Sequence, residues 1–424
     1  MRKFKIKATA FVIAAVLLLA GCEKTELGGT GDNGSGASDK ENNSDNSSVL
    51  IIEDGVLKEV SPELTEAVIP DEVTVIENAF GGCTELTSIV LPDGVTEISE
   101  NAFDGCTNAK ITYKDKIYGN NQFKLLYRII NEGKSETGFT LPFETYSKGV
   151  YMVNLDTGFA VVSQNADEIL YPASITKIMT CIVALENVID LNAPVIAPYD
   201  ECFAEFWGPN PNFIGASAAN IQPDQNNLTY LDCLYGLMLS SGCEAANIIA
   251  YNAGGNSIER FVEMMNETAQ KIGCKNTHFT NAHGLFEEEN YTTAYDMYLI
   301  TKYGIDNIPL FSEICNSFQY EMPANSAASK PYTITNINRM INPKSDYYYE
   351  GAANIKTGSI NEYYLRQGDG YDEQNHVVGF RTMVTTAERN GSSYMVVTLG
   401  APYVKEQTPY LDHTDLYNWA FESF

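Results

Sequence analysis

The chain has 424 residues and carries 55 acidic against 27 basic side chains, a formal net charge of −28 at pH 7. This length allows two domains and one large hydrophobic core. Such an acidic chain excludes non-specific binding to nucleic acid, because the phosphate backbone repels it, and it suits an extracellular surface.

Residues 1–22 have the pattern of a targeting segment. Four basic residues precede an apolar stretch, residues 8–20, that is too short to span a bilayer as a stable helix. The segment ends in Leu19-Ala20-Gly21-Cys22, which resembles a bacterial lipoprotein box. The resemblance implies that Cys22 is lipidated and that the protein is anchored to the membrane outside the cytoplasm, facing the cell wall. A plain secretory signal and an uncleaved anchor helix remain alternatives.

Residues 23–48 consist mainly of small and polar residues, with almost no apolar side chain. Such a segment cannot bury enough surface to fold, so we predict a disordered linker. It would act as a flexible tether behind Cys22.

Residues 49–131 contain an internal repeat with a period of 22 to 23 residues. Ile69-Pro70-Asp71-Glu72-Val73-Thr74 is echoed by Leu91-Pro92-Asp93-Gly94-Val95-Thr96, and Asn78-Ala79-Phe80-Gly81-Gly82-Cys83 by Asn101-Ala102-Phe103-Asp104-Gly105-Cys106. The pattern resembles bacterial surface-type leucine-rich repeats and predicts a solenoid with one apolar strand per unit. Two units are clear and degenerate ones flank them, so we expect the module to dock onto its neighbour. Whether it binds a ligand or is only a spacer stays open.

Residues 145–424 alternate between strand and helix patterns. Alternation predicts a β-hairpin over 150–162, with its turn at Asp156-Thr157-Gly158. Spacing and capping residues predict helices from Pro172, over 229–239, 256–273 and 293–304, and a loop-rich stretch over 193–227. Strands are predicted over 352–358, 377–386 and 393–399, followed by a helix over 411–424.

The first of these helices carries a candidate nucleophile. Pro172 suits a first helical position, so Ser174 is predicted in the first turn, with Lys177 three residues on and on the same face. A serine needs a nearby base, and a lysine becomes one when burial lowers its pKa. The apolar run that follows, residues 178–183, predicts that burial.

Two further motifs follow the Ser-x-x-Lys motif in order: Ser241-Gly242-Cys243 and Lys356-Thr357-Gly358. This order is the signature of class A β-lactamases and penicillin-binding proteins. With the flanking Asn281-Ala282-His283-Gly284-Leu285 and Tyr291-Thr292-Thr293-Ala294, residues 145–424 resemble the serine D-alanyl-D-alanine carboxypeptidases, the low-molecular-mass penicillin-binding proteins. The resemblance implies a mixed α/β fold of the β-lactamase type, an antiparallel sheet flanked by helices, here preceded by the repeat solenoid.

The resemblance also assigns roles. Ser174 would attack the penultimate D-alanine carbonyl of a peptidoglycan stem peptide and release the terminal D-alanine, and β-lactams would acylate the same serine. Lys177 would be the general base, kept neutral with help from the like charge of Lys356. Ser241 would relay a proton to the leaving amine. The remaining contacts to substrate would come from Lys356, Thr357, Gly358, Ser359 and Cys243, with the backbone N–H groups of Ser174 and Ser359 as oxyanion hole.

Other hydrolytic chemistries find little support. A zinc carboxypeptidase needs clustered ligands, and the four histidines, His278, His283, His376 and His413, are not at ligand spacing. We therefore expect no metal and no cofactor, and we interpret His283 as a structural loop residue. A Glu-x-x-Leu-Asn loop, which a class A β-lactamase needs, is missing after the middle motif. Of nine cysteines, we expect those beyond Cys22 to be mostly reduced and buried.

Two departures from the family pattern keep an alternative open. Cys243 stands where the family usually has asparagine, and the segment after Ser359 continues into a Gly/Asp-rich insertion over 367–374. The alternative is a surface protein whose repeats bind a partner and whose penicillin-binding domain is weak or inactive.

Overall fold

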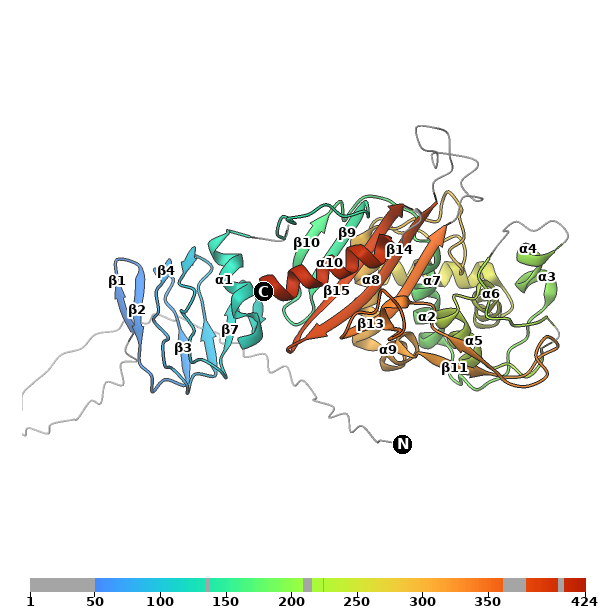
Figure 1. The fold of residues 1–424 in the computed structure, drawn as a ribbon, viewed down its shortest axis with the longest axis horizontal. Coiled ribbons are helices and arrows are strands. Elements are labelled where there is room, and N and C mark those ends of the chain that lie inside the picture. Colours follow the sequence, from blue (N-terminus) through green and yellow to red (C-terminus); the bar gives the residue numbers. More distant parts are fainter. Residues whose placement is uncertain (1–49, 135–137, 209–215, 224, 361–378, 403–407) are drawn as a thin grey trace, which may run out of the picture. The chain divides into compact units, whose positions relative to one another are not determined.

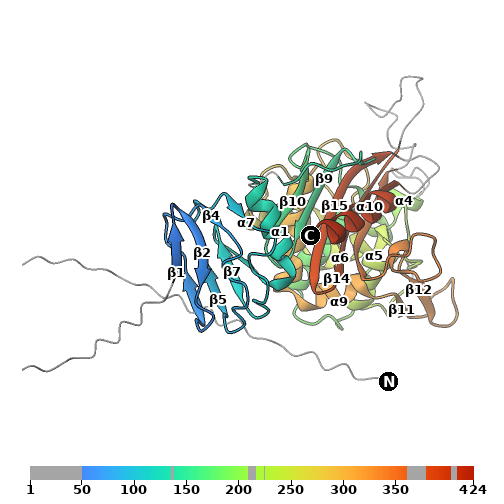
Figure 2. The same cartoon turned by 60° about the vertical axis from the view of Figure 1, so that its left-hand side comes forward.

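The repeats build two short sheets from alternating strands. The computed structural model describes residues 50–134, 138–208, 216–223, 225–360, 379–402 and 408–424. In one sheet, β2 (Val56–Val60), β4 (Val75–Ile76) and β6 (Glu97–Ile98) pair in parallel, and β1 (Leu50–Glu53) adds to β2 antiparallel. In the other, β3 (Glu66–Val68), β5 (Ser88–Val90) and β7 (Lys110–Tyr113) pair in parallel, and β8 (Lys116–Tyr118) closes a hairpin with β7. Figure 2 shows these strands in blue.

Each repeat unit therefore contributes two strands, and the prediction of one strand per unit is wrong. The division falls at the Pro-Asp turns, where Val73 N–H donates to the Pro70 carbonyl and Val95 N–H to the Pro92 carbonyl. Proline has no N–H for a strand ladder, so the chain turns there and begins the strand of the second sheet.

The repeat core is apolar and regular. Phe80 stacks on Phe103 with ring centroids 5.3 Å apart, and Phe103 lies 5.3 Å from Phe123. The thiols of Cys83 and Cys106 point inward, each 3.5 Å from a backbone carbonyl of the preceding turn. All eight cysteines among the described residues are free thiols, and seven are buried, which fits the expectation of reduced cysteines.

A helix that the sequence analysis did not predict, α1 (Phe123–Asn131), follows the last repeat. The short 3₁₀ turn η1 (Asn120–Gln122) leads into it. Leu125, Leu126, Ile129 and Ile130 lie buried on one face. The Asn131 side chain exchanges hydrogen bonds with the backbone of Ile98, at 2.9 and 3.0 Å. The helix thus satisfies backbone groups that the last repeat would otherwise expose.

The repeat module also contacts the domain that follows it. Lys116 Nζ donates to the Gly158 carbonyl and Lys124 Nζ to the Glu422 carbonyl, both at 2.9 Å. The guanidinium of Arg128 lies over the rings of Phe139 and Phe424, at 4.6 and 5.0 Å. These contacts agree with the docking expected for so short a solenoid, and residues 48–424 form one compact unit.

The second domain is built on a five-stranded antiparallel sheet in the order β10-β9-β15-β14-β13. The predicted hairpin is present as β9 (Gly149–Asn154) and β10 (Phe159–Gln164), and the other strands are β13 (Ala352–Ile360), β14 (Phe380–Arg389) and β15 (Ser392–Pro402). A separate two-stranded ribbon pairs β11 (Gln319–Met322) with β12 (Tyr332–Thr335), and the 3₁₀ turn η3 (Arg339–Ile341) precedes β13.

Helices cover both faces of the sheet, as the resemblance implied. On one side, α10 (Thr408–Ser423) packs on β14 and β15; on the other, α8 (Ala294–Asn307) packs on β9 and β15, and α9 (Pro309–Asn316) on β13 (Figure 1). The remaining helices are α2 (Thr176–Asn187), α5 (Tyr230–Leu239), α6 (Cys243–Ala253), α7 (Ile258–Ile272) and two short ones, α3 (Tyr199–Cys202) and α4 (Ala204–Trp207). Helix α6 was not predicted, and α3 and α4 lie in the stretch predicted to be loop-rich. None of the described helices is long and apolar enough to cross a membrane.

Candidate active site

Ser174 lies in a strained turn between β10 and α2, not inside a regular helix. Residues Ala173–Ile175 form the 3₁₀ turn η2, Pro172 caps it, and α2 begins at Thr176, so the predicted helix start at Pro172 is wrong. Ala173 has a φ of +51°, a left-handed conformation that is costly for a residue with a Cβ. The Thr382 hydroxyl of β14 donates to the Pro172 carbonyl at 2.8 Å and ties this turn to the sheet.

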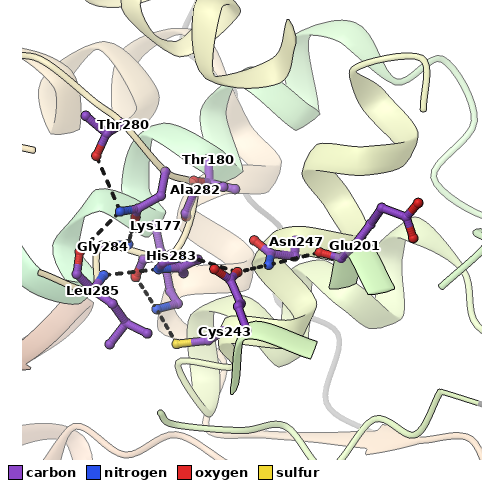
Figure 3. Close-up of polar contacts among 12 residues, drawn as sticks. Lys177, Thr180, Glu201, Cys243, Asn247, Thr280, Ala282, His283, Gly284 and Leu285 are labelled. Atoms are coloured by element: carbon purple, nitrogen blue, oxygen red, sulfur yellow. Dashed lines mark hydrogen bonds and ion pairs between the residues drawn. The ribbon is translucent and has the colours of Figure 1, made fainter. Parts of the chain in front are cut away.

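The Lys177 amine is fully buried and lies 3.1 Å from Ser174 Oγ. It also donates to the carbonyl of His283 at 2.5 Å and approaches Cys243 Sγ at 3.5 Å (Figure 3). Burial lowers the pKa of Lys177, although Cys243 and Glu244 pull the pKa back up. The geometry therefore places the Lys177 amine against the serine hydroxyl, as the spacing predicted.

The junction of α5 and α6 brings the middle motif to the same place. The predicted capping pair, Thr229 and Asp232, starts α5, and Ser241 follows its end with a φ of +60°. Cys243, the first residue of α6, supplies the thiol beside Lys177. Ser241 Oγ is buried and finds no hydrogen-bond partner among the described residues, so it is not joined to Lys177 or Ser174 there.

Strand β13 carries the third motif along the edge of the sheet. A β-bulge falls between Asn354 and Lys356, which re-aims the strand at this point, and Lys356 is buried. Its amine donates to the Thr357 carbonyl at 2.8 Å. Burial and then the nearby Lys177 lower the pKa of Lys356 well below its ordinary value. The like-charge effect expected between the two lysines therefore acts on Lys356, while burial dominates at Lys177.

Gly358 lies directly against the Ser174 turn. A Cβ at this position would come within 2.9 Å of the Ser174 backbone nitrogen and 2.3 Å of Thr382 Oγ1. A side chain does not fit there, which explains glycine in the motif. Ser359, the next residue, is exposed, and Thr357 is partly exposed. Strand β13, which carries both positions, packs against the turn η2 that holds Ser174.

The loop over residues 281–285 is a part of the site that the sequence analysis did not assign. The carbonyl of His283 accepts from Lys177, and that of Ala282 accepts from Thr180 Oγ1 at 2.7 Å. Gly284 has a φ of +77°, and a Cβ there would lie 2.0 Å from the Ala173 carbonyl. The family phrase around His283 was the one hint of this loop in the sequence. A motif of side chains does not indicate, however, that the backbone carbonyl of His283 is the group that contacts Lys177.

Glu244 is a second buried group that the sequence analysis did not assign. Its carboxylate accepts from the Ala219 N–H at 2.6 Å and the Ile221 N–H at 3.3 Å. Burial raises the pKa of Glu244 to about 7, against these hydrogen bonds. It holds the segment that carries Ser217, whose hydroxyl donates to the Ser241 carbonyl at 2.6 Å.

No group of histidines, cysteines and carboxylates within the described ranges is arranged to hold a metal ion. Cys22, His376 and the Gly/Asp-rich insertion fall outside the described residues, so the lipidation of Cys22 stays a prediction.

The arrangement is that of a serine acyl-transfer site, and comparison with known proteins agrees. The D-alanyl-D-alanine carboxypeptidase family matches residues 135–362, more than half of the chain. The chain belongs to this family. Ahead of this carboxypeptidase region, the BspA type leucine rich repeat region matches residues 51–132 in six copies, where the sequence analysis had distinguished two clear units. Together these matches favour the carboxypeptidase interpretation over the alternative of a surface protein whose penicillin-binding domain is weak or inactive.

The chain matches individual members of the carboxypeptidase family over part of their length. The chain is 31% identical over 218 residues to D-alanyl-D-alanine carboxypeptidase DacF of Bacillus subtilis, covering 51% of each chain. It is 32% identical over 174 residues to DacD of Escherichia coli, covering 40% of this chain and 43% of that protein. The chain thus spans about half the length of these curated relatives or less. The crystal structure of the Streptomyces K15 DD-transpeptidase superimposes with a TM-score of 0.54 at 26% identity, over 67% of this chain and all of that one.

Proposed function

We propose that the protein is a serine-type D-alanyl-D-alanine carboxypeptidase that trims the terminal D-alanine from peptidoglycan stem peptides. One observation carries the proposal: the buried Lys177 amine lies 3.1 Å from Ser174 Oγ in a chain of this family. β-Lactams would acylate the same serine and act as covalent inhibitors.

Acylation begins with the transfer of the Ser174 hydroxyl proton to the neutral Lys177 amine, as Ser174 Oγ attacks the penultimate D-alanine carbonyl. Negative charge then develops on the carbonyl oxygen, and the backbone N–H groups of Ser174 and Ser359 would stabilise it. The close approach of Gly358 to the Ser174 nitrogen supports this pair, because it brings β13 and the Ser174 turn into contact.

The substrate's terminal carboxylate would bind Lys356 and Thr357. An anion there favours the charged form of Lys356, and that charge in turn favours the neutral form of the neighbouring Lys177. Substrate binding thus prepares the general base. Ser241, whose buried hydroxyl is free of hydrogen bonds within the described part of the chain, would pass a proton to the departing D-alanine amine.

The second half of the reaction decides between two outcomes. Water attacking the acyl-enzyme gives a carboxypeptidase, whereas an amine gives a transpeptidase, the activity named for the Streptomyces K15 structure. Both share the acyl-enzyme on Ser174. Product analysis with a D-alanyl-D-alanine peptide, with and without glycine as an amine acceptor, distinguishes them: free tripeptide or tetrapeptide acid indicates hydrolysis, and a glycine adduct indicates transfer.

Labelled penicillin tests the nucleophile. The wild-type protein is expected to form a covalent adduct on Ser174, and Ser174→Ala to form none. Labelling of Ser174→Ala at the wild-type rate refutes the assignment. Failure of the wild type to label, in a folded sample, refutes the proposed activity and supports the alternative of an inactive domain whose repeats bind a partner.

We further infer that the protein works outside the cytoplasm, held to the membrane by lipid on Cys22 and facing the cell wall. The support is the sequence pattern of residues 1–22. Wild-type protein is expected in the detergent phase. Cys22→Ala is expected to carry no lipid, and it should either enter the aqueous phase or stay in the membrane with its signal segment uncleaved. A mature N-terminus that begins beyond Cys22 and carries no lipid, measured by mass spectrometry, contradicts this inference.

A further inference from the structure

The carbonyl that holds Lys177 belongs to a histidine whose ring is itself held in place. His283 is buried, and its Nε2 lies 3.3 Å from Glu205 Oε1 on α4. On the other side of the ring, Nδ1 accepts the N–H of Leu285 at 3.1 Å. The Phe206 ring packs edge-on against the imidazole at 5.3 Å. Two consecutive residues of α4 therefore fix the orientation of this imidazole.

These contacts define the tautomer of His283. Nδ1 accepts a backbone N–H, so the proton of the neutral ring is on Nε2, where it donates to the Glu205 carboxylate. A ring with its proton on Nδ1 would face the Leu285 N–H with a second donor and offer Glu205 only a lone pair. Glu205 thus selects one ring orientation and one tautomer.

Glu205 is anchored in turn by the helix that carries Cys243. The Asn247 side-chain amide donates to Glu205 Oε1 and, at 3.5 Å, to the Glu201 carbonyl (Figure 3). Asn247 is one helical turn after Cys243 on α6, so both lie on one face. Burial raises the pKa of Glu205, but His283 and Asn247 outweigh burial and leave the pKa lowered, so the carboxylate stays charged.

The orientation of the Lys177 amine decides whether it works as a base. A neutral amine has two N–H groups and one lone pair. In the neutral form, N–H groups directed at the His283 carbonyl and toward Cys243 Sγ would leave the lone pair on the side of Ser174 Oγ, which lies 3.1 Å away. A shift of the His283 carbonyl would turn the lone pair away from the hydroxyl, although nothing that touches the substrate would have changed.

We infer that Glu205 is a positioning residue for acylation, which acts through the His283 ring and carbonyl on the direction of the Lys177 lone pair. The inference rests on the proposed function for its kinetic consequence. Its geometric consequence, the Lys177–His283 contact, can be measured without activity.

The experiment measures the affinity and the acylation rate constant for a chromogenic β-lactam separately, by stopped flow. Glu205→Ala is expected to lower the acylation rate constant about tenfold or more, since a misplacement of ~1 Å can cost ~10²-fold, with unchanged affinity. Glu205→Gln retains an oxygen acceptor for His283 Nε2–H and is expected to keep most of the rate. Glu201→Ala is the matched control: it removes a carboxylate from the neighbouring helix α3 and is expected to leave the rate unchanged.

A merely structural role predicts another pattern. In that case Glu205→Ala would lower thermal stability and leave the acylation rate constant of the folded fraction unchanged. That result overturns the inference. An equal loss in Glu205→Gln and Glu205→Ala also overturns it, because the hydrogen bond would then not matter. Where Glu205→Ala does not fold, Asn247→Ala removes the anchor of the carboxylate instead and is expected to lower the rate constant to a smaller extent.

A crystal structure of Glu205→Ala, or of Asn247→Ala, answers the geometric question even for a protein that no β-lactam acylates. We expect the Lys177 Nζ–His283 carbonyl contact to be lost or lengthened. An unchanged contact refutes the inference and leaves the proposed function standing. Absence of wild-type acylation together with a lost contact refutes the proposed function and its kinetic consequence, and it leaves standing only that Glu205 fixes the Lys177–His283 contact.

Discussion

The repeat module and the catalytic domain bury different kinds of side chain. Between residues 50 and 134, Gln122 is the one polar side chain buried among the described residues, and the interior is built of apolar residues that recur with the repeat. The catalytic domain buries two lysines, Lys177 and Lys356, and ionisable groups such as Glu244 and His413. The first interior serves stability, and the second shifts the pKa values of the ionisable side chains that are buried in it.

The physical cost of the two interiors differs accordingly. Burying an apolar side chain contributes roughly 1.5–3 kcal/mol to stability, whereas burying a charge is unfavourable unless it is paired or neutralised. Burial lowers the pKa of both Lys177 and Lys356, so each lysine loses its proton more readily than it would in water. Changes in the catalytic interior should therefore act on rate and pH dependence, and changes in the repeat interior on stability alone.

The largest effect is expected at the base. Lys177→Ala removes the proposed proton acceptor of Ser174. Since general-base catalysis typically contributes ~10²–10⁴-fold, the acylation rate constant should fall by that factor while the fold is retained. Stopped-flow or gel-based acylation by penicillin measures it, with circular dichroism as the check on folding. A loss below tenfold would assign the base role to another group.

In the repeat core, Phe80→Ala should destabilise without touching chemistry. Phe80 is fully buried and stacked on Phe103, so truncation is expected to cost about 3–5 kcal/mol. Denaturant unfolding followed by intrinsic fluorescence measures the loss, and acylation assayed well below the new midpoint should be unchanged. A fall in the acylation rate would contradict the distinction between the two interiors, because it would show that the repeat interior is coupled to the catalytic site.

A smaller effect is expected from His413, which is fully buried between the Thr385 and Thr398 hydroxyls. Burial lowers the pKa of His413 to about 3. Between about pH 3 and pH 6.5 the unfolded chain binds a proton that the folded chain does not, so stability is lost as the pH falls below about 6.5. At pH 5 this loss is about 2 kcal/mol, from ~1.4 kcal/mol per pH unit.

His413→Asn isolates this contribution. From pH 7 to pH 5, the unfolding free energy of the wild type should fall by about 2 kcal/mol relative to that of the variant. Taking the difference cancels other groups, including Glu244, whose raised pKa acts in the opposite direction. A pH-independent difference would show that the His413 side chain titrates alike in both states.

The smallest effect concerns Cys243. Asparagine offers an amide donor and acceptor to the substrate's peptide group, whereas a thiol is a weak partner. We expect Cys243→Asn to raise kcat/KM on a D-alanyl-D-alanine peptide about tenfold, or roughly 1.4 kcal/mol. Steady-state kinetics of both proteins on one peptide measures it. Because the thiol lies 3.5 Å from Lys177, an unchanged or lower kcat/KM would mean that the site has adapted to cysteine.

Local patterns predicted those features that local physics determines. The capping pair at Thr229 and the hairpin turn at Asp156-Thr157-Gly158 are contained within a few neighbouring residues, and the repeat period follows directly from residues that recur every 22 to 23 positions. The Ser174–Lys177 pair belongs to the same class, because three residues of helix-like chain bring the two side chains together. The order of the three motifs then indicated the family.

The sequence by itself therefore determined the family and the repeat architecture in outline, and it indicated Ser174 and Lys177 as the candidate nucleophile and base. Only the tertiary structure decided that each repeat unit supplies two strands, that Ser174 lies in a 3₁₀ turn, and that Lys177 donates to the His283 carbonyl, 106 residues further along the chain. Glu205 offers no local signal at all, since its role depends on α4 meeting the 281–285 loop. Contacts of this kind arise from packing between distant segments, and no spacing along the chain encodes them.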